Sequence, residues 1–337
     1  MQATQSEGRS VMKARIGLLL VALCSAGGLW ARDLGELYDR QTLSRAAAVY
    51  GPNIQGLFRE DFLDRLTFQE RVSLPNVHLE TPLIGPQRSP WEFFALPARQ
   101  KIVVPVLSIR FLDDLAITYA HLERHQCDRE QLFNYLTRLF YDKRFPAIPP
   151  RQALGIPADA LDDPYVDDVS QKILKSTIYF LVGHEYAHLL YQHQGYEHIT
   201  AAQAQAQESQ SDTFALEIMR RIGVPPLSMA FFFTLASRID PVPAAFSSTA
   251  EFERYLQKKQ THPLTGKRLQ NVAGYLRRHA DSYARLQANP TTWVSALQAS
   301  ATDIENLGRI VHDAQFRQFQ LKRGLAATES QMRSACP

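Results

Sequence analysis

The 337-residue sequence predicts a mainly α-helical protein with a small antiparallel β-sheet, an α+β fold. Apolar residues recur with helical periodicity over most of the chain, whereas strand-like patterns are confined to residues 72–81 and 91–106. Hydrophobic residues make up 45% and charged residues 21% of the chain, which is ordinary for a globular protein with a sizeable core.

The predicted elements follow in order along the chain. Residues 33–48 form a helix, residues 72–81 a strand, and residues 91–106 a hairpin around residues 97–100. Helical periodicity then covers residues 107–125, 129–143, 226–238, 264–286 and 304–323. Residues 145–168, rich in Pro and Asp, are expected to form a loop. We expect one domain over residues 32–323, with a helical insertion at 107–168, C-terminal helices at 264–323 and a flexible tail at 324–337.

The amino terminus predicts export. A basic stretch at residues 12–15 precedes the apolar residues 16–30 and several small residues, which is typical of a signal peptide covering residues 1–31, with Met12 as a possible true start. Fifteen apolar residues are too few for a membrane span, which needs about twenty. We expect a periplasmic or secreted protein with no transmembrane span after signal removal. A lipoprotein anchored at Cys24 is the alternative, which Leu23 disfavours.

Signal removal leaves Cys127 and Cys336 in an oxidising compartment. A disulfide between them is an open possibility, because two cysteines so far apart in the sequence need not meet. The net charge of +3 is small, and no basic run or Gly-rich phosphate loop is present. The sequence therefore gives no indication of a nucleic-acid partner, and we expect none.

The most informative motif is His184-Glu185-Tyr186-Ala187-His188, an H-E-x-x-H pattern. On a helix, two histidines four residues apart lie on one face and can bind one metal ion. Glu185 lies beside that face, where its carboxylate reaches a metal-activated water without binding the metal itself. The pattern predicts a zinc-dependent hydrolase with Glu185 as general base.

Glu208 is the expected third ligand. It follows the second histidine by twenty residues, which leaves room for the first helix to end and for Thr200 to cap a second one. Asp212, one turn beyond Glu208, can accept a hydrogen bond from a zinc-binding histidine. Glu197 and His198, in the intervening loop, are the alternative third ligands.

The other histidines near this spacing are expected to be structural. His121 and His125 are also four residues apart, but no carboxylate lies at a useful distance from them in the sequence. His193 is five residues past His188 and is expected to end the helix, facing the negative end of its dipole.

Two histidines followed by a glutamate on the next helix resemble the gluzincin peptidases, and the spacing to Glu208 and Asp212 is similar to the thermolysin type. Residues 93–97 with 101–104 resemble the hairpin that precedes the zinc helix in the HtpX, Oma and BepA-type peptidases. His262-Pro263, followed by Arg268, is similar to the His-Pro…Arg signature of that family. The resemblance covers roughly residues 90 to 270. It implies a zincin-like fold for the domain at 32–323 and one Zn²⁺ per chain.

The resemblance implies an endopeptidase that hydrolyses exported or misfolded proteins. Its ligands would be His184, His188 and Glu208, with Asp212 orienting one imidazole. His262 matches a residue that approaches the zinc or the transition-state oxyanion in some relatives; equally, it is a residue that precedes a helix.

The implied substrate is a polypeptide. If residues 101–104 form a sheet edge above the zinc, they can bind it as an added strand; an ordinary core hairpin is the alternative. A latent or inactive zinc protein that acts as a chaperone or assembly factor in the cell envelope, with envelope proteins as partners, is the alternative function.

Overall fold

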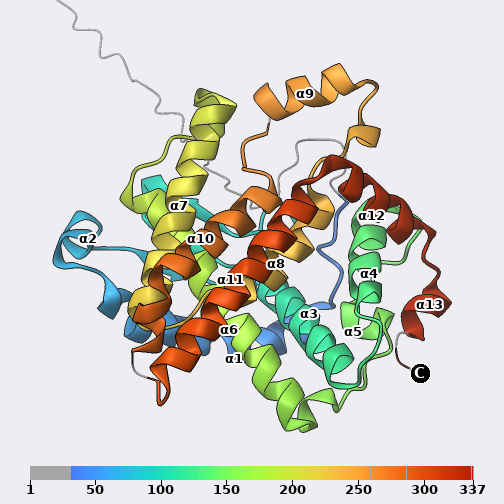
Figure 1. Ribbon diagram of the computed structural model, residues 1–337, viewed down its shortest axis with the longest axis horizontal. Helices are drawn as coiled ribbons and strands as arrows, with labels where there is room; N and C mark the ends of the chain where they lie inside the picture. The colour runs from blue at the N-terminus through green and yellow to red at the C-terminus, as the bar shows by residue number, and fades with distance from the viewer. Residues whose placement is uncertain (1–31, 259, 286, 335, 337) are drawn as a thin grey trace, which may run out of the picture.

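The computed structural model describes residues 32–258, 260–285, 287–334 and 336. It confirms the expected fold class, a mainly helical chain with one small sheet (Figure 1). The signal peptide, the Cys24 anchor and the Met12 start lie outside the described residues. None of the helices in the described part of the chain is long and apolar enough to span a membrane.

The α-helices are, in chain order, α1 (Arg40–Gly56), α2 (Phe68–Ser73), α3 (Val106–Arg124), α4 (Glu130–Tyr141), α5 (Pro150–Ala153), α6 (Pro164–Leu190), α7 (Ala201–Ile222), α8 (Ser228–Ala236), α9 (Thr249–Lys258), α10 (Thr265–Ala284), α11 (Pro290–His312), α12 (Ala314–Ala326) and α13 (Glu329–Arg333). The strands are β1 (His78–Glu80), β2 (Phe94–Leu96) and β3 (Lys101–Val103).

The helical predictions hold for most of the chain. The helix expected at 33–48 starts later, at Arg40, because the Asp39 side chain caps it, and it continues to Gly56. The strand expected at 72–81 is confined to His78–Glu80. The stretch at residues 304–323 spans two helices, because the Asp313 side chain accepts a hydrogen bond from the Phe316 backbone N–H (2.7 Å) and starts α12. The loop predicted at 145–168 ends early, because Asp163 caps α6 and Pro164 occupies its first turn.

The sheet has the order β1-β3-β2 and is mixed. The predicted hairpin is confirmed by antiparallel pairing of β2 with β3, in which Ala95 lies opposite Ile102. β1 joins the other side of β3 in parallel, and the Val104 N–H donates to the Glu80 carbonyl (2.9 Å) just beyond it.

Both sides of β3 are therefore occupied. The prediction that residues 101–104 form an open edge for an added substrate strand is wrong, because β1 fills that edge. The outer strands of the described sheet are β1 and β2.

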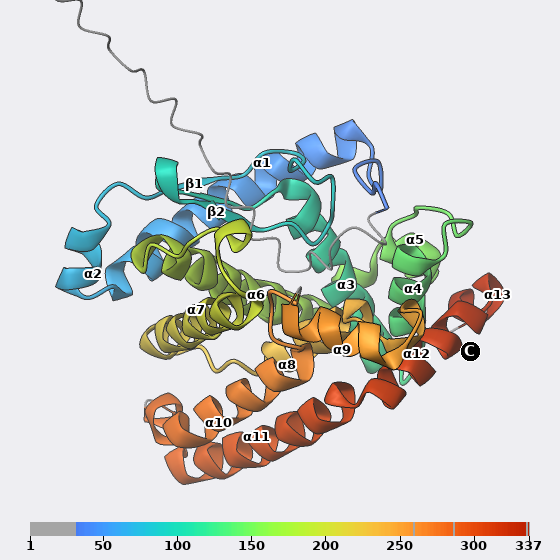
Figure 2. The ribbon, with the colours of Figure 1, turned by 90° about the horizontal axis from the view of Figure 1, so that it is seen from above.

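Figure 2 shows the elements in layers, with α1 and the sheet on one side, α6 and α7 in the middle, and α10 with α11 on the far side. Helix α6 is the centre of the fold and packs against α3, α7, α8 and β2. Nearly every side chain from Thr177 to Leu189 is buried, as expected for a helix that is apolar on all its faces. Helix α3, which lies within the insertion expected at 107–168, packs along α6.

Helices α6 and α7 approach each other closely at Gly183. A Cβ atom added at Gly183 would lie 3.0 Å from the Ala215 Cα and 3.3 Å from its Cβ. Such distances are shorter than ordinary carbon contacts, so a larger side chain would push the helices apart. Gly183 directly precedes His184, and the spacing of these helices is therefore coupled to the histidine positions.

We expect Gly183→Val to destabilise the fold by about 1–3 kcal/mol, because the added methyl groups overpack the α6–α7 contact. Gly56→Val, at the end of α1, is the matched control, since a Cβ there meets nothing within 4 Å. Urea unfolding of both variants measures the difference. Equal midpoints for Gly183→Val and the wild type would contradict this packing.

In the part of 324–337 that the structure describes, where a flexible tail was expected, the chain forms the end of α12 and the short helix α13. Thr328 and Gln331 form a capping box at the start of α13, and Met332 is 1% exposed. Cys127 and Cys336 form a disulfide, which ties this end to the turn between α3 and α4. A long-range covalent link and a buried side chain are features that local sequence polarity does not reveal.

The disulfide joins residues 209 positions apart, and cross-linking so long a loop restricts the unfolded chain strongly. We expect Cys127→Ser with Cys336→Ser to lower the free energy of unfolding by about 2–4 kcal/mol. Urea unfolding with and without dithiothreitol measures this: the reductant should shift the wild type and leave the double variant unchanged. A wild type insensitive to the reductant would refute the expectation.

Candidate metal centre

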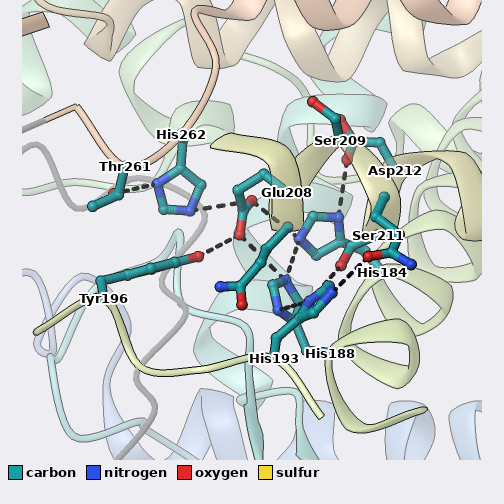
Figure 3. Close-up of polar contacts among 12 residues, drawn as sticks. His184, His188, His193, Tyr196, Glu208, Ser209, Ser211, Asp212, Thr261 and His262 are labelled. Atoms are coloured by element: carbon teal, nitrogen blue, oxygen red, sulfur yellow. Dashed lines mark hydrogen bonds and ion pairs between the residues drawn. The ribbon is translucent and has the colours of Figure 1, made fainter. Parts of the chain in front are cut away.

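Two helices bring the three expected ligands together. His184 and His188 lie on α6, Glu208 lies on α7, and all three side chains are fully buried (Figure 3). The two imidazole Nε2 atoms are 3.1 Å apart. The Glu208 carboxylate spans both rings, with Oε2 3.3 Å from the Nε2 of His184 and Oε1 3.2 Å from that of His188.

These separations fit a tetrahedral metal ion. Ligand atoms bound to zinc at about 2.0 Å lie about 3.3 Å from one another along the edges of the tetrahedron. Two imidazoles and a carboxylate are also a donor set that divalent transition metals prefer. The His184, His188 and Glu208 group can therefore hold a metal ion.

A second carboxylate holds the first imidazole in place. Asp212, one turn after Glu208, has its Oδ1 2.9 Å from the His184 Nδ1. The Arg268 guanidinium, on α10, donates to both oxygens of Asp212, at 2.7 and 2.5 Å. Burial raises the pKa of Asp212, but Arg268 and His184 outweigh it and hold the pKa below its ordinary value. The orientation of His184 thus depends on a third helix.

The charges of neighbouring side chains favour the ionised forms of His184 and Glu208. Burial lowers the pKa of His184, but the Glu208 charge and the contact with Asp212 outweigh it and raise the pKa to about 10. Burial opposes ionisation of Glu208, whereas His262 and His184 lower its pKa well below the usual range. A buried carboxylate that stays ionised requires positive charge beside it, which the neighbouring histidines supply here and which a bound cation would supply in their place.

Glu185 lies beside these ligands and is completely buried. Neither of its oxygens has a hydrogen-bond partner among the residues that the structure describes. Burial raises the pKa of Glu185 to about 8, and the nearby Glu208 charge adds to this rise. A carboxylate with a pKa near neutrality is suited to exchanging protons, because both protonation states are accessible.

Two more side chains reach Glu208 from the opposite side. The Tyr196 hydroxyl donates to Oε1 of Glu208, and the His262 Nε2 lies 3.4 Å from Oε2. The Tyr196 and His262 rings meet edge to face, with centroids 5.5 Å apart. Sequence reasoning missed Tyr196, because a lone tyrosine in the loop between two ligand helices carries no spacing signal.

The alternative third ligands lie elsewhere. Glu197 and His198 have side chains that are 52% and 69% exposed, and they contact each other at 3.5 Å. His121 and His125 also pair with each other, with ring centroids 4.5 Å apart. None of these four residues belongs to the buried group.

His193 lies just past the end of α6, where its backbone N–H donates to the His188 carbonyl (3.1 Å), and its side chain is buried. It is 8% exposed, and its ring lies against His188, with centroids 4.8 Å apart. Burial, together with the neighbouring His188, lowers the pKa of His193 to about 4, so its ring is neutral at pH 7.

Comparison with known proteins gives one match. The family model described as Peptidase U49 matches residues 119–288, half of the chain. The matched region contains the whole buried group from His184 to Asp212, as well as His262 and Arg268. Neither a curated protein nor a solved structure matches the chain.

Proposed function

The chain belongs to the peptidase U49 family and is therefore a peptidase, and we propose that it is a zinc-dependent endopeptidase of the gluzincin type. The observation that carries the proposal is the buried group of His184, His188 and Glu208, with an unpartnered Glu185 directly beside it. A metal-dependent peptidase needs an unpartnered carboxylate beside its metal ligands, whereas a structural metal site does not.

The finer resemblance to the HtpX, Oma and BepA-type peptidases is part of the proposal. It is supported by the positions of His262 and Arg268, the two residues of the His-Pro…Arg signature. His262 lies against Glu208, and Arg268 holds Asp212 behind His184. Both residues therefore contact the group that the resemblance assigns to zinc.

The proposed roles follow from the contacts. His184, His188 and Glu208 would hold the zinc, which polarises the peptide carbonyl and activates a water molecule when bound. Glu185 takes a proton from the attacking water and delivers it to the leaving amine. The Tyr196 hydroxyl and the His262 imidazole contact the Glu208 carboxylate, and either group would be a candidate to donate a hydrogen bond to the developing oxyanion.

The substrate would be an extended polypeptide segment, and β2 is the strand best placed to bind it. The outer side of β2 has no partner strand among the described residues, and β2 packs on α6. The Ala95 backbone lies near the Glu185 carboxylate and lowers its pKa, although the two groups do not meet in a regular hydrogen bond. A strand added along β2 would thus bring its backbone next to the proposed general base.

We place this activity in the periplasm or outside the cell, on exported or misfolded proteins. The disulfide between Cys127 and Cys336 supports an oxidising compartment, since such bonds are rare in the cytosol. The predicted signal peptide points to the same compartment.

The test is metal-dependent cleavage of an unfolded protein. Purified protein should contain one zinc per chain, cleave unfolded casein, and lose this activity with phenanthroline and regain it with added zinc. Cleavage that persists after complete metal removal would refute the zinc mechanism, and a chain that binds no divalent metal would refute the site.

A second candidate function is that of a latent zinc protein acting as a chaperone or assembly factor in the envelope. The observation that favours it is the burial of Glu185 and all three ligands, with Tyr196 and His262 covering Glu208. His262→Ala separates the two functions. Higher casein cleavage in this variant at unchanged zinc content would support a latent site, whereas lower kcat would support a catalytic His262.

A further inference from the structure

The second histidine of the group has a buried polar neighbour of its own. The Nδ1 of His188 lies 3.0 Å from the Nδ1 of His193 (Figure 3). The Nε2 of His193 lies 3.1 Å from the Oε1 of Gln210. These three side chains form a continuous polar chain that begins on α6 and ends on α7.

The backbone holds His193 in this position. Gln192 has a positive φ of 52°, so the chain reverses just after α6 and turns back toward the helix. The His193 N–H donates to the His188 carbonyl at 3.1 Å. The next residue, Gln194, is joined to Gln207 of α7 by two hydrogen bonds, at 2.9 and 3.1 Å. His193 is thus fixed from both sides, although it lies in a loop.

The direction of the protons follows from the chemistry of each group. A neutral imidazole has one N–H donor and one acceptor nitrogen. The Oε1 of Gln210 accepts, so the His193 proton is on Nε2 and its Nδ1 is an acceptor. The Nδ1 of His188 must then carry a proton, which leaves the lone pair of its Nε2 facing Glu208 and His184. This tautomer is the one that can bind a metal through Nε2.

We propose that His193 is a positioning residue that fixes the orientation and tautomer of the metal-binding His188, with Gln210 fixing the tautomer of His193 in turn. This inference rests on the proposed zinc site. Asp212 orients the ring of His184 in the same way. The two ligand histidines therefore have different partners, an anionic carboxylate for one and a neutral imidazole for the other.

This asymmetry limits the negative charge around the metal. A carboxylate partner makes its histidine a stronger donor, whereas a neutral partner orients the ring with less added charge. Glu208 and Asp212 already supply two carboxylates at the site. A neutral partner at His188 holds the ligand while leaving the metal a stronger electrophile.

The test compares zinc affinity in variants at His193. His193→Phe keeps an aromatic ring but removes the acceptor, and we expect zinc affinity, measured by competition with a chelator, to fall about 10- to 100-fold. His193→Asn retains an acceptor and should recover part of the loss. His198→Phe is the matched control in the same loop, because His198 is exposed and contacts only Glu197 among the ion pairs described there; it should bind zinc like the wild type.

A merely structural role for His193 would change stability without changing zinc affinity, so unfolding of the zinc-free variants is followed by circular dichroism. Wild-type zinc affinity in a folded His193→Phe variant overturns the proposal. Absence of zinc binding in the wild type itself would instead overturn the proposed function.

A measurement on the wild type covers the case in which His193→Phe does not fold. In the zinc-loaded protein, ¹H–¹⁵N correlation spectra of the histidine rings should show protons on Nδ1 of His188 and on Nε2 of His193. A proton on Nδ1 of His193 would overturn the proposal, since that nitrogen could not then accept from His188.

Discussion

Glu185→Gln is expected to lower the kcat for peptide hydrolysis by about 10²–10⁴-fold while the zinc content stays at one per chain. The substitution replaces one carboxylate oxygen by an amide nitrogen and removes the carboxylate that is proposed to exchange protons. Since Glu185 does not belong to the His184, His188 and Glu208 group, metal binding should not depend on it. The measurement pairs casein cleavage with metal analysis of the same preparation.

The fold should also tolerate this change. Neither Glu185 oxygen has a hydrogen-bond partner among the described residues, so the amide breaks no bond seen there, and the buried charge disappears. Glu197→Gln is the control, because Glu197 is exposed and should leave both readouts unchanged. Full activity of Glu185→Gln with stoichiometric zinc would remove Glu185 from the role of general base.

Glu208→Ala should release the metal, with zinc affinity falling by more than about 100-fold, because loss of a ligand exceeds the effect of losing an orienting partner. The two histidines would keep their positions on α6 but lose the carboxylate that spans them. Metal content after dialysis, together with chelator competition, measures the change.

Glu208→Gln distinguishes loss of charge from loss of volume. The amide fills nearly the same space as the carboxylate, so a cavity cannot account for metal loss in this variant. We expect Glu208→Gln to lose metal as well. If both variants retain wild-type zinc, Glu208 is not a ligand and the nearby Tyr196 and His262 become the groups to test.

The periodic parts of the fold were predictable because their signals are local. Helices α3, α4, α8 and α10 follow apolar periodicity, and β2 with β3 follows two short apolar runs around a turn. The observed helix boundaries differ from the predicted ones where an N-cap residue starts a helix, as at Asp163 and Asp313. The pairing of β1 with β3 was not predictable, since residues 78–80 and 101–103 pair across a long stretch of chain.

By itself the sequence determined the candidate metal centre: the spacing of His184, Glu185 and His188 on one helix, and of Glu208 and Asp212 on the next, follows from the helical repeat. Tertiary packing decided what surrounds it. Arg268 reaches Asp212 from α10, Tyr196 reaches Glu208 from a loop, and the chain turns back to place His193 on His188. The reason is physical: helical spacing is fixed by local backbone geometry, whereas the partners of a buried polar group depend on which distant segments pack against it.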